Sequence, residues 1–235
     1  MFPESQIAAD PRAVINLAVA ARAQFLTRVY THLFGALVGF TLLEVAYFQT
    51  GLAQRMTEAM LGTSWLLVMG AFIIVSMLAT KVAFSSASKA SQYMALGGFV
   101  LAESIIFVPL LWMANTYAGG GVIASAGFVS LAGFAGLTGI ALFTRKDLSF
   151  LRPMIMWAGL CAIGLIVAAV IFGFNLGVVF SVAMVLLAGA SILYDTQQIL
   201  HRYPEDRYVG ASLQLFASVA MLFWYVLRIF MSSRN

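Results

Sequence analysis

Apolar stretches long enough to cross a bilayer recur along the whole chain and are separated by short polar segments. A helix needs about 20 mainly apolar residues to cross membrane hydrocarbon, and it satisfies its own backbone hydrogen bonds there. The alternation of apolar and polar residues that is typical of a membrane β-barrel is absent from these stretches. The pattern predicts an all-α integral membrane protein, a seven-helix bundle with spans at residues 25–48, 64–84, 91–114, 121–143, 153–174, 176–200 and 208–230.

The polar segments between these stretches are too short to hold a folded soluble domain. We therefore divide the chain into a cytosolic N-terminal tail (1–24), a transmembrane domain (25–230) and a short C-terminal tail (231–235). Any chemistry of the protein has to lie inside the bundle.

The composition agrees with a bilayer environment. With 62% hydrophobic and 9% charged residues, the chain has too little polar surface to cover a soluble globule of 235 residues. The net charge of +4 comes from basic residues scattered over short loops, whereas a nucleic-acid partner needs a dense basic patch. The expected partner is therefore the lipid bilayer, and no nucleic acid is expected.

Basic residues also predict the orientation, because the cytoplasmic flanks of membrane helices carry an excess of Lys and Arg. The bias predicts a cytoplasmic N-terminus. A re-entrant last segment would move two of the remaining three basic residues inside, so the charges leave the side of the C-terminus open. Ten of the 13 Lys and Arg residues fall on the N-terminal side, and they are Arg12, Arg22, Arg28, Lys81, Lys89, Arg145, Lys146, Arg152, Arg202 and Arg207.

One ionisable residue, Asp195, lies close to the end of the apolar stretch 176–200. Residues three and four apart share a helix face, so Asp195 belongs to a polar stripe with Ser191, Gln198 and Arg202. A carboxylate inside a span persists only if it faces protein or water and has a partner. Asp195 is therefore the first candidate for a functional residue.

The last apolar stretch carries a second polar stripe, which includes Gln214 and Ser218, and we expect it to meet the stripe of Asp195. Two interpretations of Asp195 stay open at this point. A fixed ion pair with an arginine such as Arg28 or Arg202, or an interhelical hydrogen bond, would only hold the helix in register. Alternatively, Asp195 marks an ion or proton pathway, which is the more common role of acids inside membranes.

Two further acids lie in predicted spans. Glu103 is near the middle of the stretch 91–114, where it lines a pore or bonds to a neighbouring helix, and the sequence does not choose between these roles. Glu44 is near the outer end of the first span, and we expect its side chain to reach the solvated interface.

Small residues recur at helical spacing in the first and fourth spans, and such spacing predicts close contacts between helices. The residues concerned are Gly35, Gly39, Gly133, Gly136 and Gly139.

Motifs of known enzyme classes are missing from the chain. The pair Tyr194 and Asp195 is half of what an intramembrane aspartyl protease needs, but the other aspartates fall in the tail or in loops. Gly-x-Ser-x-Gly, His-Glu-x-x-His and phosphate-binding glycine loops are also absent. Without these motifs we expect no enzyme activity and no cofactor. We also expect no metal site, since His32 and His201 have no other metal-ligating residue types near them in sequence.

The segment 191–199, Ser-Ile-Leu-Tyr-Asp-Thr-Gln-Gln-Ile, resembles the signature of the Bax inhibitor-1 family, also called the transmembrane Bax-inhibitor-motif family, in its bacterial YccA-like branch. Segments 25–30, 144–150 and 213–216 resemble the family's entry into its first span, its loop between spans four and five, and its last helix. The resemblance covers nearly the whole chain. It implies a bacterial inner (plasma) membrane protein in which six spans surround the last.

The resemblance also implies a pH-sensitive calcium leak in which an aspartate of the sixth span pairs with an aspartate of the last helix. Asp195 matches the first aspartate, but Ser218 stands at the second position and Met221 replaces a usual asparagine. Two carboxylates can share a proton and a serine cannot reproduce this. The chain is therefore either a cation leak gated by Asp195, alone or with Glu103, or a scaffold without the switch.

A function from a different class is the alternative. The same resemblance implies a non-transporting regulator, either of a membrane-anchored ATP-dependent protease or of stress and cell-death responses. The tail 1–24 is then the segment expected to meet the partner, and its deletion distinguishes the two functions.

Overall fold

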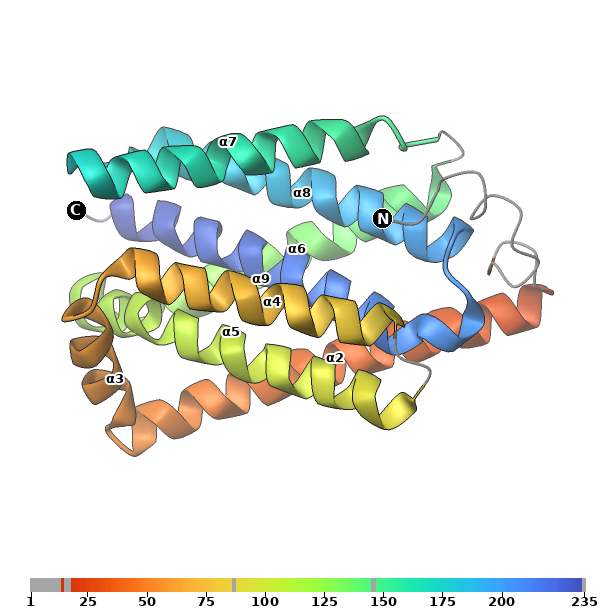
Figure 1. The fold of residues 1–235 in the computed structure, drawn as a ribbon, viewed down its shortest axis with the longest axis horizontal. Helices are drawn as coiled ribbons and strands as arrows, with labels where there is room; N and C mark the ends of the chain where they lie inside the picture. Colours follow the sequence, from red (N-terminus) through yellow and green to blue (C-terminus); the bar gives the residue numbers. More distant parts are fainter. Residues whose placement is uncertain (1–13, 15–17, 86–87, 145–146, 234–235) are drawn as a thin grey trace.

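The computed structural model describes residue 14 and residues 18–85, 88–144 and 147–233, and it places them almost entirely in helices (Figure 1). Seven of these helices are long and apolar enough to cross a membrane, as the sequence predicts. The elements are α2 (Val19–Gln49), α3 (Leu52–Leu61), α4 (Trp65–Ser85), α5 (Lys89–Tyr117), α6 (Val122–Phe143), α7 (Leu151–Phe172), α8 (Gly177–His201), the 3-10 turn η2 (Glu205–Arg207) and α9 (Tyr208–Ser232).

The short helix α3 is the element that the apolar pattern did not predict. It has ten residues, including Gln54, Arg55 and Glu58, so it is too short and too polar to be recognised as a span. Figure 1 shows it at one end of the bundle, between the end of α2 and the start of α4. It closes that end of the bundle by packing against α2 and α5.

The helices at both ends of the chain extend beyond the predicted spans. Helix α2 begins at Val19, six residues before the predicted start of the first span, and α9 continues to Ser232. Val14 is fully buried, and its backbone N–H donates to the Tyr203 carbonyl at 3.0 Å. The chain before the first span is therefore attached at Val14 to the turn between α8 and α9, whereas residues 1–13 and 15–17 lie outside the described part.

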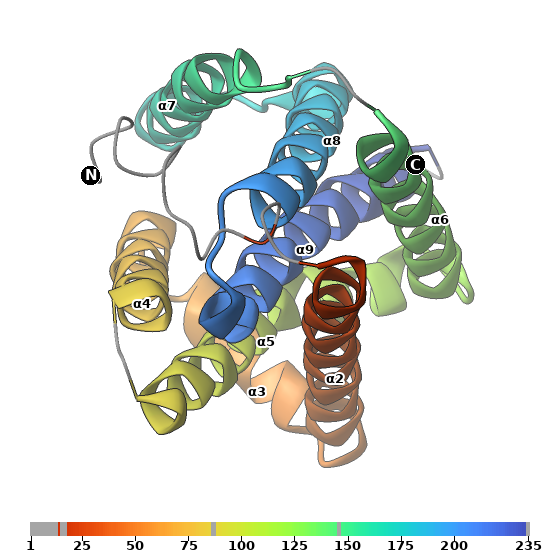
Figure 2. The same cartoon turned by 90° about the vertical axis from the view of Figure 1, so that its right-hand side faces the viewer.

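Helix α9 packs against α2, α4, α5, α6 and α8. Viewed along the bundle, it runs between α2, α5, α6 and α8, while α7 lies at the periphery beyond α8 (Figure 2). The closest pair is α8 and α9, which η2 joins into a hairpin. Aromatic rings anchor α9, with Phe107 of α5 packed against both Phe223 and Trp224.

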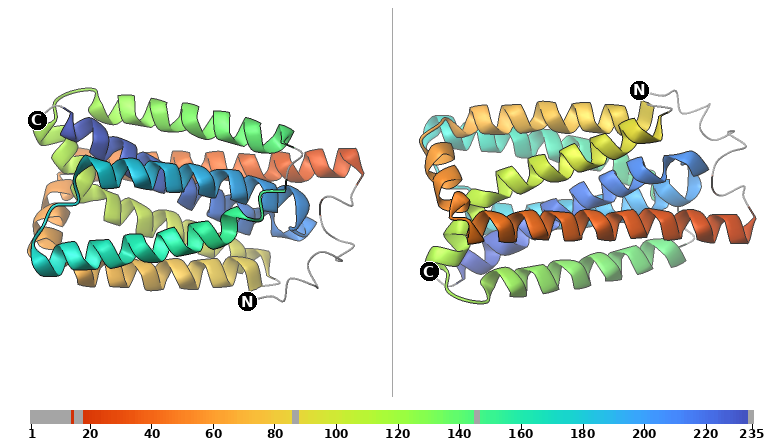
Figure 3. Two further views of the ribbon diagram at one scale, coloured as in Figure 1. Left: turned by 90° about the horizontal axis from the view of Figure 1, so that it is seen from above. Right: turned by 90° about the horizontal axis from the view of Figure 1, so that it is seen from below.

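Helix α9 is one uninterrupted helix of 25 residues, about 37 Å long at 1.5 Å per residue. This length exceeds the roughly 30 Å of membrane hydrocarbon. Figures 1 and 3 show that α9 ends at the same end of the bundle as α3, opposite the start of α2. The arrangement agrees with full crossing rather than a re-entrant segment, and the cytoplasmic N-terminus remains a prediction.

The glycines of the first and fourth spans divide into two groups. A Cβ added at Gly39 or Gly133 would meet a side chain of another helix at ordinary contact distance, Val100 at 3.9 Å and Leu222 at 3.8 Å. A Cβ added at Gly35, Gly136 or Gly139 would have no other heavy atom within 4 Å, so the prediction of close packing is wrong at these three. At Gly210 of α9, by contrast, an added Cβ would lie 3.1 Å from the Ala83 carbonyl oxygen and 3.1 Å from the ring of Phe84. The close approach is between α4 and α9.

We expect Gly210→Ala to destabilise the bundle by about 1–3 kcal/mol, because the added methyl group overpacks the contact with α4 and the backbone of α4 cannot move away easily. The gain in helix propensity, about 1 kcal/mol, offsets part of this cost. Thermal unfolding in detergent measures the change. Gly136→Ala is the matched control, and its melting temperature should stay equal or rise, since no atom opposes the new Cβ.

Candidate functional site

Asp195 lies in the interface between α8 and α9, where it is 5% exposed. Its carboxylate accepts two hydrogen bonds from α9. Gln214 Nε2 donates to Oδ1 at 2.5 Å, and Ser218 Oγ donates to Oδ2 at 2.6 Å. The three-four spacing of the two polar stripes therefore predicted the right contact. We call the group of Asp195, Gln214 and Ser218 the α8–α9 clasp.

Ser218 occupies the place that the resemblance assigns to a second aspartate. The pairing of this position with Asp195 is kept, with a hydroxyl group instead of a second carboxyl group. The clasp contains one acidic group and two neutral donors, so only Asp195 can change its charge within it.

Tyr203 extends the clasp beyond the end of α8. Its hydroxyl group donates to Gln214 Oε1, which turns the Gln214 amide nitrogen towards Asp195. Burial, together with the nearby Asp195 carboxylate, raises the pKa of Tyr203 above its ordinary value near 10. The phenol therefore stays protonated at physiological pH and keeps the Gln214 amide in this orientation.

We expect Tyr203→Phe to lower the free energy of unfolding by about 1–2 kcal/mol, because Gln214 Oε1 loses its donor. The phenol has a higher pKa in the folded state, so its contribution is constant between pH 6 and 8 and disappears only as the pH rises beyond about 10. Thermal unfolding at both pH values checks the size and the pH independence. Tyr117→Phe, at a side chain that is 69% exposed, should cost less than about 0.5 kcal/mol.

The basic residues expected near Asp195 point elsewhere. Arg202 donates to Ser149 Oγ at 2.8 Å, so it joins the end of α8 to the loop before α7. The guanidinium group of Arg28 lies 5.6 Å from the ring centroid of Tyr208. Within the part of the chain that the structure describes, Asp195 forms no ion pair, so the ion-pair form of the structural interpretation is wrong, whereas the bonds from α9 are the interhelical hydrogen bonds of its other form.

The loop before α7 is fixed on α8 at this same end of the bundle. Gln197 Oε1 accepts a hydrogen bond from the Leu148 N–H at 2.9 Å. Asp147 accepts from both the hydroxyl group and the N–H of Ser149, and these bonds lower the pKa of Asp147. The loop is thus built around an ionised Asp147, which does not contact the clasp.

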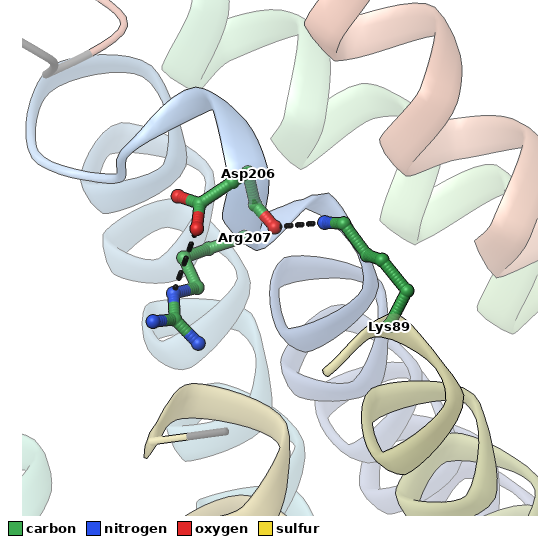
Figure 4. Close-up of polar contacts among 3 residues, drawn as sticks. All are labelled: Lys89, Asp206 and Arg207. Carbon is green, nitrogen blue, oxygen red and sulfur yellow. Dashed lines mark hydrogen bonds and ion pairs between the residues drawn. The ribbon is translucent and has the colours of Figure 1, made fainter. Parts of the chain in front are cut away.

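Cationic groups gather at the start of α5 and α9. Lys89 Nζ donates to the Asp206 carbonyl oxygen, and Arg207 Nε lies 3.6 Å from the Asp206 carboxylate (Figure 4). Lys89 Nζ also lies 4.2 Å from the ring centroid of Tyr208, the same ring that Arg28 approaches. These contacts fix the start of α9 relative to α2 and α5.

Two other predicted residues do not contact the carboxylate of Asp195. Ser191 donates to the carbonyl of Leu187 in its own helix at 3.0 Å. Gln198 is half-buried on α8 and forms no hydrogen bond to the clasp. The site is therefore smaller than the predicted stripe.

The carboxyl groups of Glu103 and Glu44 are both buried. Glu103 lies at the midpoint of α5 and is 7% exposed, and it makes no hydrogen bond or ion pair with the residues that the structure describes. Glu44 is 6% exposed, so the expected solvated position is wrong. Its burial could not be read from α2 alone, because residues of α5, α6 and α9 line the same crevice.

Tyr203 is the residue bonded to the clasp that the sequence analysis missed. It follows the end of α8, and the helical spacing used for the stripe does not extend to it. The sequence feature that could have predicted this position is the short connection between α8 and α9, which brings residue 203 beside Gln214. Among the described residues, no three His, Cys, Asp or Glu side chains lie close enough together to hold a metal ion.

Comparisons with known proteins agree with this architecture. A family model described as "Inhibitor of apoptosis-promoting Bax1" matches residues 22–235. An uncharacterized protein of Pseudomonas aeruginosa is 36% identical over 113 residues, which cover 48% of this chain and 50% of that protein. The match thus spans about half the length of that relative.

A second relative carries a functional name. YccA of Escherichia coli, named as a modulator of the FtsH protease and as an inner membrane protein, is 31% identical over 153 residues. This region covers 62% of the chain and 67% of YccA. Together with seven membrane-length helices and the match over residues 22–235, the similarity shows that the chain belongs to the Bax inhibitor-1 family.

Proposed function

We propose that the protein is a passive, pH-sensitive leak for cations, and for Ca²⁺ in particular, with Asp195 as the proton-sensitive element. The observation that carries the proposal is a buried carboxyl group between two helices whose bonded partners are all neutral. An acid in this setting is costly to keep in a membrane, and acids that persist there mark ion or proton pathways more often than not.

The clasp supplies a physical switch. An ionised carboxylate among neutral donors is less well solvated than in water, so ionisation favours a state in which α8 and α9 separate and Asp195 is hydrated. Protonation of Asp195 removes this cost, and the Ser218 hydroxyl oxygen can then accept a hydrogen bond from the protonated carboxyl group. The leak is therefore expected to close at low pH and to open as the pH rises.

Glu103 supports a pathway at a second depth. Asp195 lies six residues before the end of α8, about 9 Å along its axis, whereas Glu103 lies halfway along α5. Both acids are buried in the bundle and no Lys or Arg pairs with either within the described residues. Two such acids at successive depths are suited to pass a cation in steps.

Calcium entry into proteoliposomes tests the leak. The wild type should admit Ca²⁺ faster than empty vesicles at pH 8, and Glu103→Gln should slow this entry because one acidic step is lost. Glu58→Gln is the control, since Glu58 is exposed on α3 and bonds to Gln54. Entry equal to that of empty vesicles would remove the leak from consideration.

The second candidate function is modulation of a membrane-anchored, FtsH-type protease. The similarity to YccA favours it, as does the hydrogen bond from Val14 to Tyr203, which attaches the N-terminal segment beside the clasp. Deletion of residues 1–13 should abolish co-purification with the protease and leave Ca²⁺ entry unchanged. If the deletion leaves the protease bound, this segment is not the contact.

A further inference from the structure

A crevice of about 680 Å³ lies between α2 and α6, with residues of α5 and α9 at its base. Its volume is within the range of about 300–1,000 Å³ that is typical of sites for small ligands. Figure 3 shows α2 and α6 running side by side along this face of the bundle. The side chains that line the crevice are mainly apolar, and Phe40, Phe107, Phe216 and Phe223 are among them.

Glu44 is the exception in this apolar crevice. Its side chain is buried, yet neither carboxylate oxygen has a hydrogen-bond partner among the residues that the structure describes. The buried Ser130 hydroxyl, which also lines the crevice, likewise lacks a partner within that part of the chain. An unpaired buried carboxyl group is costly, so the crevice is suited to a ligand that brings hydrogen-bond donors to Glu44.

The polar residues mark one end of the crevice. Besides Glu44, the lining includes the exposed amides of Gln49 and Asn115, near the ends of α2 and α5. Helix α2 is 31 residues long, about 46 Å, and exceeds the hydrocarbon thickness by roughly 16 Å. With this excess divided equally between the two ends of α2, Glu44, five residues or about 8 Å before the last residue, lies at the edge of the hydrocarbon, near the level of lipid headgroups.

We propose that this crevice binds one phospholipid with a primary-ammonium headgroup. The ammonium group donates hydrogen bonds to Glu44, the phosphate accepts from Gln49 and Asn115, and one acyl chain fills the apolar length of the crevice. A primary ammonium group has three N–H donors and a positive charge, which together satisfy both carboxylate oxygens. The site is separate from the clasp, and the proposal does not depend on the leak.

The comparison of two lipids tests the proposal. Phosphatidylethanolamine and phosphatidylcholine with identical acyl chains differ only in the headgroup nitrogen, which keeps its N–H donors in the first and is fully methylated in the second. Native mass spectrometry of the full-length protein in detergent gives the two apparent affinities. We expect the wild type to prefer phosphatidylethanolamine about tenfold, as a charge-assisted hydrogen bond predicts.

Three variants locate the preference. Glu44→Gln should bring the ratio of the two affinities to about one, whereas Glu58→Gln, at an exposed carboxyl group, should leave it unchanged. Gly127 lines the crevice, and a Cβ added there would meet open space. Gly127→Leu should therefore weaken the binding of both lipids equally. Equal binding of the two lipids by the wild type, or a preference that survives Glu44→Gln, would overturn the proposal. If Glu44→Gln does not fold, the ratio of the two lipid affinities in the wild type and the loss of binding in Gly127→Leu still test the proposal.

Discussion

Replacing Ser218 by aspartate is expected to enlarge the pH response of the protein, with Ca²⁺ entry at pH 8 at least about tenfold faster than at pH 6. The Ser218 hydroxyl lies 2.6 Å from the Asp195 carboxylate, so Ser218→Asp places two carboxyl groups in contact. Below the pH at which both carboxyl groups ionise, they share a proton and hold α8 to α9. Above it they repel, at a cost of about 1–3 kcal/mol, and the helices separate.

Ser218→Asn is the matched control for this effect, because its amide has a similar size and cannot ionise. Proteoliposomes with this variant should show a pH response no larger than that of the wild type. Equal flux for Ser218→Asp and Ser218→Asn at both pH values would mean that the contact between residues 195 and 218 does not control ion passage.

Gln214→Leu is expected to cause the largest loss of stability, about 2–4 kcal/mol. Gln214 connects Tyr203 to Asp195, so its loss leaves the Tyr203 hydroxyl without an acceptor and the carboxylate with one donor fewer. Loss of a hydrogen-bond donor costs more folding free energy when the buried acceptor is charged than when it is neutral. Thermal unfolding in detergent, followed by tryptophan fluorescence, measures the change.

Two comparisons make this prediction specific. Gln198→Leu, at a half-buried glutamine of α8 that does not bond to the clasp, should cost less than about 1 kcal/mol. Combined with Asp195→Leu, the effect of Gln214→Leu should shrink, because the two side chains interact directly. Full additivity of the two substitutions would contradict the hydrogen bond as the source of the loss.

The sequence predicts the helices and the central contact well, because both depend on local periodicity. The apolar stretches locate all seven long helices. The three-four spacing within each polar stripe, one with Asp195 and the other with Gln214 and Ser218, predicts that α8 and α9 meet there. The connection between the two helices is short, so few other pairings are available.

The parts that sequence did not predict depend on tertiary contacts. Arg28 and Arg202 have long side chains with several alternative partners, and each selects a ring or a hydroxyl group away from Asp195. Burial of Glu44 requires the surfaces of three other helices, which no pattern within α2 records. The position of Tyr203 follows from a turn outside regular helix, where spacing rules no longer apply.

The most direct test of the proposed function is Ca²⁺ entry into proteoliposomes at pH 6 and pH 8 for the wild type and for Asp195→Asn. If ionisation of Asp195 opens the bundle, wild-type entry rises several-fold from pH 6 to pH 8, and the Asn variant shows the same rate at both. Asp206→Asn serves as the control, since that side chain is 57% exposed and its carboxylate lies 3.6 Å from Arg207 Nε rather than in the clasp. A wild type that admits no more Ca²⁺ than empty vesicles at either pH, or an Asn variant with an unchanged pH response, would contradict the role of Asp195.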